Sequence, residues 1–377
     1  MKSITRFIIL IATAIVLHSC SKAEYTDAIP NNSTALIAVN ATHFASDKSP
    51  FASLLTPFMD KNAKQLKGID LTKNIYLFAA ADGNLGLCAP VADNSSLEDF
   101  TTRLETIGVL NNHKEIDGNN FYTFKDQWVV GNSDNCLLIM GPVTGADAQN
   151  TLMRRMARLL NRDDDETIKN SPLWDNLCEL KGKIRMVAQA SALPEQLALI
   201  VTLGAPKGTD ASDILLKADM EYDKGTLVLN GKATSYNQNV EQSMDKSLTT
   251  YRPITIDWRK VMNDSTLVGI FMNVKGSDVM PLIQQNKSLN SMLMGTESYD
   301  KIRNNDGNMA IMLAPNGKGD SDDKYKVSVK TSMPDTRKGN DRMIVAVNIK
   351  SLTEPIAESV KPFLGNINTI IYNLKVE

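Results

Sequence analysis

Four apolar runs constrain the fold more than any other feature of the sequence. Each of them ends in Asn or Gln and is followed by a helical pattern. The runs end at Asn40, Gln189, Asn273 and Asn348. A Ser or a Pro follows where the next helix begins. The Ser side chain can accept a hydrogen bond from a free amide of the first helical turn, and Pro has no amide hydrogen that needs an acceptor. A recurrence of this kind predicts a body built from one repeated unit.

Three pairs of further strands follow the helical patterns. The segments between paired strands are rich in Asp, Asn and Gly, which favour the turns of β-hairpins. The pairs are residues 74–80 with 85–90, 215–221 with 226–233, and 309–314 with 324–331. The resulting order is strand–helix–strand–strand, and not the strict strand–helix–strand alternation of a parallel sheet.

This order predicts an α+β fold, in which repeated strand–helix–strand–strand modules form mostly antiparallel sheets with helices packed on one face. Apolar residues at helical spacing predict the longer helices at residues 97–107, 147–161, 195–203 and 278–294, with another near 51–66. Since the second module begins near Gly182, we predict an N-terminal domain of residues 33–180 and a C-terminal domain of residues 181–377. One continuous long sheet is the alternative.

The first 19 residues have the pattern of a signal peptide. Lys2 and Arg6 precede an apolar run at residues 7–17. That run is too short to cross a bilayer as a helix, which takes about 20 apolar residues. The sequence therefore predicts a segment that is removed after export.

The last residue of this run and the three that follow it, Leu-His-Ser-Cys at 17–20, resemble the lipobox of bacterial lipoproteins. The resemblance implies cleavage between Ser19 and Cys20, a diacylglycerol thioether on Cys20 and acylation of the new amino group. Residues 20–32 would then be the lipidated Cys and a short tether. Several acyl chains hold a protein firmly on a membrane, whereas one chain alone binds marginally. The alternative is an ordinary secretory signal cleaved near Ser19.

Charge argues against a nucleic-acid partner. The full sequence holds 41 Lys+Arg and 43 Asp+Glu, a net charge of −2. Residues 1–19 carry two basic side chains and no acidic one, so the mature chain has a net charge of −4. Nucleic-acid-binding proteins normally show a strong basic excess. The hydrophobic share of 42% excludes a disordered polymer.

The remaining cysteines and histidines predict no metal site and no cofactor. Cys88, Cys136 and Cys178 lie in apolar strand or helix patterns, so we expect three buried small hydrophobes, of which at most two can pair. The sequence has no Cys-x-x-Cys, and only His43 and His113 remain after processing. Zinc sites need more ligands than this at suitable spacing.

No catalytic residue can be assigned from a motif. The sequence lacks the Gly-x-Ser-x-Gly of hydrolases and the Gly-rich loops of nucleotide sites. We expect His43 and His113 to be solvated or locally hydrogen-bonded. Trp128 and Trp258 are expected to be core or edge anchors. The acidic runs at 163–166 and 320–323 suit a helix start and a solvated loop.

A family resemblance begins directly after Cys20. A Lys-containing spacer leads to Tyr-x-x-x-Ile-Pro at residues 25–30 and then to the strand that ends at Asn40. This arrangement resembles an uncharacterised lipoprotein family of Bacteroides-type bacteria, which is labelled a domain of unknown function. The resemblance implies a lipid-anchored outer-membrane protein, on the periplasmic or the surface-exposed face. It implies no activity and no catalytic residues.

We therefore expect a lipid-anchored cell-envelope lipoprotein that is a non-enzymatic binding or structural module. It would meet the membrane through its N-terminal lipid, and its partner would be an envelope protein or a glycan. One alternative is an envelope hydrolase that acts on glycan or peptide through a motif-free pair of carboxylates. Another is a carrier for a small apolar ligand held between sheet and helices.

Overall fold

One sheet of 15 strands organises the computed structural model, which describes residues 24–44, 49–51, 68–162, 167–193, 198, 200–286, 290–291, 293–294, 296–315, 325–351 and 367–374. The strand order is β13-β12-β11-β14-β15-β10-β9-β8-β1-β2-β3-β7-β6-β5-β4. All neighbouring strands are antiparallel except β10 and β15, which are parallel. The predicted mixture of helices with a mostly antiparallel sheet is confirmed.

The strands are β1 (Ser33–Asn40), β2 (Asn74–Ala80), β3 (Leu85–Pro90), β4 (Leu110–Ile116), β5 (Asn119–Phe124), β6 (Trp128–Asn132), β7 (Cys136–Gly141), β8 (Ile184–Gln189), β9 (Ile214–Asp223), β10 (Thr226–Ser235), β11 (Val268–Lys275), β12 (Asp306–Pro315), β13 (Tyr325–Met333), β14 (Met343–Asn348) and β15 (Thr369–Leu374). The α-helices are α2 (Ala41–Phe44), α4 (Asn94–Thr106), α5 (Ala146–Leu160), α6 (Pro172–Glu179), α8 (Gln238–Leu248), α9 (Gly276–Gln285) and α11 (Glu297–Arg303). Short 3-10 helices include η1 (Tyr25–Ala28), η3 (Ile168–Asn170), η4 (Ala190–Ala192), η6 (Trp258–Lys260) and η7 (Ile349–Ser351).

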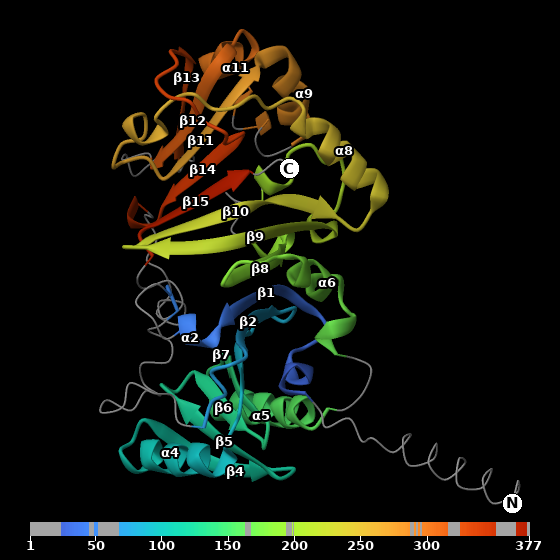
Figure 1. The fold of residues 1–377 in the computed structure, drawn as a ribbon, viewed down its shortest axis with the longest axis vertical. Coiled ribbons are helices and arrows are strands. Elements are labelled where there is room, and N and C mark those ends of the chain that lie inside the picture. The colour runs from blue at the N-terminus through green and yellow to red at the C-terminus, as the bar shows by residue number, and fades with distance from the viewer. Residues whose placement is uncertain are drawn as a thin grey trace, which may run out of the picture.

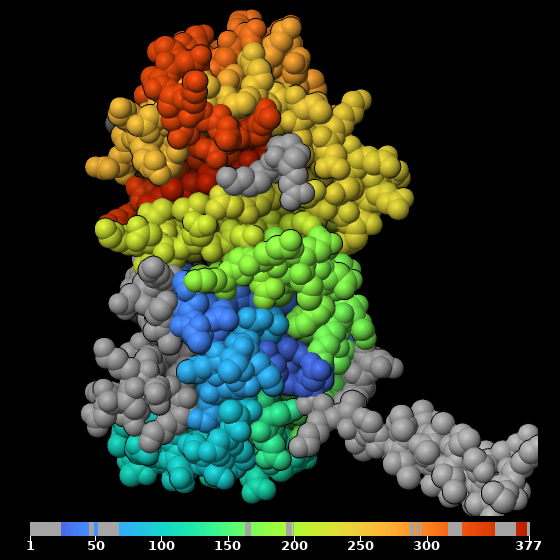
Figure 2. All heavy atoms as spheres, viewed as in Figure 1, coloured from blue at the N-terminus to red at the C-terminus, as the bar shows by residue number. Residues whose placement is uncertain are grey.

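The molecule is elongated along the sheet (Figure 1). β9 and β10 cross its middle, with β1 to β7 on one side and β11 to β15 on the other. In the space-filling view these two strands form a yellow-green band between the two halves (Figure 2). The sheet is not interrupted between the two predicted domains, because β8 pairs with β1 on one side and with β9 on the other. The domain boundary there stays a prediction.

Apolar side chains fill both faces of the sheet and form three core clusters. The first core cluster covers one face of both halves and includes side chains of α2, α4, α8, α9 and α11. The second core cluster lies on the opposite face of the N-terminal half and includes side chains of α5 and α6. The third core cluster lies on that opposite face in the C-terminal half, under residues 254–262.

Helix packing on a single face is therefore not confirmed. The strand β7 shows the physical reason, since all six of its residues are buried. Leu137 and Ile139 point into the first core cluster, whereas Leu138 and Met140 point into the second. A strand that is apolar on both sides needs cover on both sides, and α4 and α5 provide it.

Each of the four strands that end in Asn or Gln pairs antiparallel with the strand that follows it. The pairs are β1 with β2, β8 with β9, β11 with β12, and β14 with β15. Two of the terminal Asn side chains start the next helical turn: Asn40 Oδ1 accepts from the amide of Thr42 at 3.2 Å, and Asn348 Oδ1 accepts from the amide of Lys350 at 3.2 Å. These contacts alone do not confirm the prediction that the strand–helix–strand–strand module is a repeated structural unit.

The predicted elements correspond to the observed ones where turn or cap residues were clear. The three predicted hairpins are β2–β3, β9–β10 and β12–β13. The helices predicted at 97–107 and 147–161 are α4 and α5. The helix predicted at 278–294 is shorter than expected, because α9 ends at Gln285. Residues 52–66 of the helix predicted near 51–66 lie outside the described residues, as do residues 195–197 and 199 of the one predicted at 195–203, in which residues 198, 200 and 201 are helical.

The parallel pair of β10 and β15 joins the two halves, and Gly231 lies in this pair opposite Leu374. A Cβ atom added at Gly231 would lie 2.0 Å from the carbonyl oxygen of Lys217 and 2.7 Å from Cα of Ala218. Both atoms belong to the backbone of β9, so they have little freedom to move aside. The close approach of β9 and β10 therefore requires glycine at this position.

We expect Gly231→Ala to lower the free energy of unfolding by about 1–3 kcal/mol, because overpacking forces backbone shifts. The matched control is Lys232→Ala, a half-buried neighbour in the same strand, for which we expect a change within about 0.5 kcal/mol. Denaturant unfolding measures both values. Equal stabilities of the two variants would show that the backbone of β9 moves aside for the added methyl group without a cost in stability.

Candidate functional site

The segment next to the predicted anchor is docked onto the sheet. Residues 24–30 include η1, and Thr26, Ala28 and Ile29 have exposed fractions of 3%, 2% and 0%. Asp27 starts the turn by accepting from the amide of Glu24 at 2.7 Å. We call residues 24–30 the docked segment. The Tyr-x-x-x-Ile-Pro pattern thus corresponds to a structural element whose apolar side chains belong to the second core cluster.

Tyr25 positions the docked segment against β2. Its hydroxyl donates to the carbonyl oxygen of Asn74 at 3.0 Å, and its ring lies 6.1 Å from the ring of Tyr76. Tyr76 in turn lies 5.4 Å from the ring of Trp174 on α6. Burial raises the pKa of the Tyr25 hydroxyl above its usual value. The hydroxyl is therefore a permanent hydrogen-bond donor at physiological pH.

Lys169 holds the docked segment by charge. Its Nζ atom lies 2.7 Å from a carboxylate oxygen of Glu24 and 3.0 Å from one of Asp27. Partial burial lowers the pKa of Lys169, but the hydrogen bonds that its ammonium group donates to the two carboxylates outweigh this and raise the pKa. Next to it, Pro30 forms an isolated β-bridge with Thr167. The segment is thus fixed by apolar, hydrogen-bonding and ionic contacts together.

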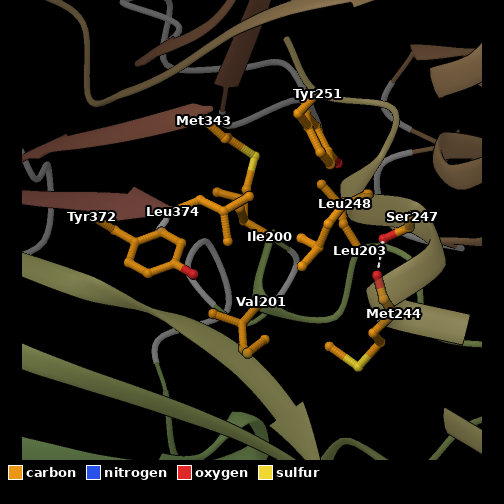
Figure 3. A pocket seen from close by; sticks show the side chains of 11 residues that line it. Ile200, Val201, Leu203, Met244, Ser247, Leu248, Tyr251, Met343, Tyr372 and Leu374 are labelled. Atoms are coloured by element: carbon orange, nitrogen blue, oxygen red, sulfur yellow. Dashed lines mark hydrogen bonds between the residues drawn. The ribbon is translucent and has the colours of Figure 1, made fainter. Parts of the chain in front are cut away.

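A small cavity lies where the two halves meet, on the face of the first core cluster. Side chains of α8, β10, β14, β15 and residues 200–203 point toward one another around it (Figure 3). The lining residues are Ile200, Val201, Leu203, Ala233, Met244, Ser247, Leu248, Tyr251, Met343, Tyr372 and Leu374. The cavity volume is about 20 Å³, which is room for about one water molecule. It is too small for an apolar ligand of several atoms in this conformation.

The polar groups of this cavity are hydroxyls. Tyr372 donates to the carbonyl oxygen of Gly231 at 3.5 Å, and Ser247 donates to the carbonyl oxygen of Met244 at 2.6 Å. Burial raises the pKa of the Tyr251 and Tyr372 hydroxyls above their usual values. None of the 11 lining residues carries a carboxylate. The pair of carboxylates that a glycoside hydrolase requires is therefore not located in this cavity.

The structure brings together two of the three cysteines that were expected to be buried small hydrophobes. Cys20 and Ser19, the predicted lipidation and cleavage site, lie outside the described residues. Cys88 and Cys136 are buried, and their Sγ atoms are 3.6 Å apart. Cys178 was expected to be buried, and this expectation is wrong. It is exposed because α6 buries the side chains of Leu173 and Leu177 and turns Cys178 toward solvent.

The histidine and tryptophan predictions can be compared directly with the structure. His113 is exposed on the edge strand β4, where its Nε2 lies 3.0 Å from Oδ1 of Asn120 and its ring stacks on Tyr122 at 4.8 Å. A locally hydrogen-bonded His113 is confirmed. Trp128 and Trp258 have exposed fractions of 6% and 7%, which confirms them as core anchors. The acidic runs at 163–166 and 320–323 lie outside the described residues.

Two kinds of feature are absent from the described residues. No group of three or more metal-ligating side chains occurs among them. None of the helices in the same part of the chain combines the length and apolar character that a bilayer crossing needs.

Three residues of these sites gave no signal in the sequence. Lys169 is separated from Glu24 by 145 residues, so only the folded chain reveals the ion pair. Tyr251 follows two threonines and Tyr372 lies in the apolar strand β15, so nothing in the sequence indicates that both line one cavity. Tyr25, in contrast, was marked by the Tyr-x-x-x-Ile-Pro pattern.

Comparison with known proteins places the chain in a family without an assigned activity. No curated protein matches the sequence. Crystal form I of TP0453 is 10% identical, with a TM-score of 0.34 and coverage of 54% of this chain and 76% of that one. Crystal form III of TP0453 is also 10% identical, with a TM-score of 0.33 and coverage of 61% and 89%. TM-scores this low do not establish a common fold.

A family model matches residues 21–305, which is more than half of the sequence and includes the docked segment, and it carries the description "Domain of unknown function (DUF4836)". The chain belongs to this DUF4836 family.

Proposed function

We propose that the protein is a lipid-anchored lipoprotein of the outer membrane that acts as a non-enzymatic binding or structural module. The observation that carries the proposal is the position of the docked segment. Only residues 21–23 separate Cys20 from Glu24, where this segment begins. A lipid on Cys20 would therefore be joined almost directly to the folded body.

The short connection limits how far the body can lie from the membrane. Four residue steps from Cys20 to Glu24 span at most about 14 Å when fully extended. Since η1 contacts β3, β7 and α5, the lipid would keep this part of the N-terminal half close to the headgroups. A long flexible stalk of the kind that lets a protein sample distant partners is absent between these two residues.

The sheet leads away from that attachment point. From β3 to the edge strand β13 there are ten strand spacings, each of about 4.8 Å, or roughly 50 Å along the sheet. The C-terminal half is therefore the part of the molecule that is free to meet an envelope protein or a glycan. We propose it as the partner-binding half.

We also propose that the body consists of repeated strand–helix–strand–strand modules. Support comes from the four Asn- or Gln-terminated strands, each paired antiparallel with the strand that follows it. The first strands of successive modules also pair with each other, β1 with β8 and β11 with β14. Repetition of one supersecondary unit is a common way to build a long sheet with similar edges and loops.

The anchor is tested by metabolic labelling with a palmitate analogue, followed by separation of inner and outer membranes. We expect the wild-type protein to be labelled and to sediment with the outer membrane. Cys20→Ala should lose the label and the membrane association, because none of the other three cysteines follows the predicted signal peptide. The matched control is Cys178→Ala, which removes an exposed thiol and should keep both. Equal labelling of Cys20→Ala and the wild type would refute the anchor.

Docking of residues 24–30 is tested with Lys169→Ala. Loss of the ion pairs with Glu24 and Asp27 should weaken docking by about 1 kcal/mol, since Asp27 is largely buried and Glu24 is mostly exposed. Hydrogen exchange of the amides of residues 25–29 should then be about fivefold faster. Lys301→Ala removes an exposed pair with Glu297 and serves as the control. Unchanged exchange in Lys169→Ala would mean that apolar burial alone holds the segment.

A further inference from the structure

Two of the three cysteines of the folded body touch each other inside the second core cluster. Cys88 lies in β3 and Cys136 in β7, and their Sγ atoms are 3.6 Å apart. Their exposed fractions are 0% and 1%. Because 48 residues separate them in the sequence, the pairing of the two strands brings the thiols together.

The register of β3 and β7 explains the contact. Cys88 lies opposite Leu138, and Cys136 lies opposite Pro90. The two cysteines are therefore diagonal neighbours whose side chains point to the same face. A disulfide bond has an S–S length of about 2.05 Å, so the sulfur atoms would have to approach by about 1.5 Å. Diagonal partners have Cα atoms about 7–8 Å apart, slightly beyond the roughly 4.4–6.8 Å that is usual for a disulfide. Bond formation therefore requires a shift of β3 against β7 as well as rotation of the two side chains.

We infer that Cys88 and Cys136 form a disulfide bond in the mature protein, while Cys178 remains a free thiol. The inference rests on the proposed envelope location, because disulfides form in compartments outside the reducing cytoplasm. Two thiols give up two protons and two electrons to a disulfide oxidant such as oxidised glutathione. The S–S bond of the oxidant breaks and yields two thiols, and the bond between the two cysteines forms.

The surroundings of the pair indicate when the bond forms. In the folded chain the Cys88 thiol donates to the carbonyl oxygen of Tyr25, with an Sγ–O distance of 3.1 Å. Burial, together with interactions with Cys136, raises the pKa of the Cys88 thiol. Since the thiolate is the reactive form, oxidation after folding is slow. The bond therefore forms before the docked segment covers the pair, and that segment then shields it from reductants.

The position of the bond predicts its effect. The bond would close the chain segment between Cys88 and Cys136 into a covalent loop, and this segment contains α4, β4, β5 and β6. These strands form one end of the sheet. A cross-link restricts the unfolded chain more strongly when it closes a longer loop. For this loop and a protein of this size we expect Tm to rise by roughly 5–10 °C.

Thiol mapping tests the bond. The protein is purified from the cell envelope and alkylated with iodoacetamide in denaturant without reductant. We expect alkylated Cys178 and a linked pair of peptides that contain Cys88 and Cys136, two hydrogens lighter than the separate peptides. The same chain is also refolded from denaturant in a buffer of reduced and oxidised glutathione. A bond that forms there but not in cells would contradict the envelope location, and no bond in either sample would overturn the disulfide.

Melting experiments test its contribution. Oxidised wild-type protein should melt at a higher temperature than wild-type protein refolded with reductant. Cys178→Ala should show the same difference, whereas the double variant Cys88→Ala/Cys136→Ala should show none. The wild-type comparison does not depend on the folding of any variant. Equal Tm values of oxidised and reduced wild type would overturn the stabilising role.

Discussion

The pairing of β10 with β15 is the contact on which the architecture depends. Without these six residue pairs, the sheet would end in two separate pieces, one of ten strands and one of five. The pairing also places α8 beside β14 and β15, and so it creates the small cavity at the junction. The first core cluster contains residues on both sides of this strand pair. Apolar packing therefore stabilises the junction together with the backbone hydrogen bonds.

Sequence patterns identified the local elements well and the long-range ones poorly. The turns at Asp82 and Asp223 predicted two hairpins because Asp and Gly specify tight turns over a few residues. β4 was missed since its residues, Leu-Asn-Asn-His-Lys-Glu-Ile, are mostly exposed at the sheet edge and show no apolar alternation. The packing of helices on both faces of the sheet could not be predicted. The sequence of a fully apolar strand such as β7 does not indicate which helix packs on which of its faces. Cys178 was assigned to the core because cysteine in an apolar pattern is usually buried, whereas α6 buries Leu173 and Leu177 instead.

The candidate site shows the same division. The Tyr-x-x-x-Ile-Pro pattern singled out the docked segment, but its partner Lys169 was visible only in the folded chain. The thiol pair lies directly below this segment, since Cys88 donates to the carbonyl oxygen of Tyr25. The docked segment thus lies between the proposed lipid attachment point, Cys20, and the cysteine contact in the core.

The parallel pair has a further consequence for a chain that is made from its N-terminus onwards. β10 ends at Ser235 and β15 begins at Thr369, so β15 is made long after β10. Until then the backbone groups at the free edge of β10 have no strand beside them, and such an edge is a template for pairing with another chain. Addition of β15 therefore decides when the new chain stops being open to association with its neighbours, and a variant without β15 would leave that edge open permanently.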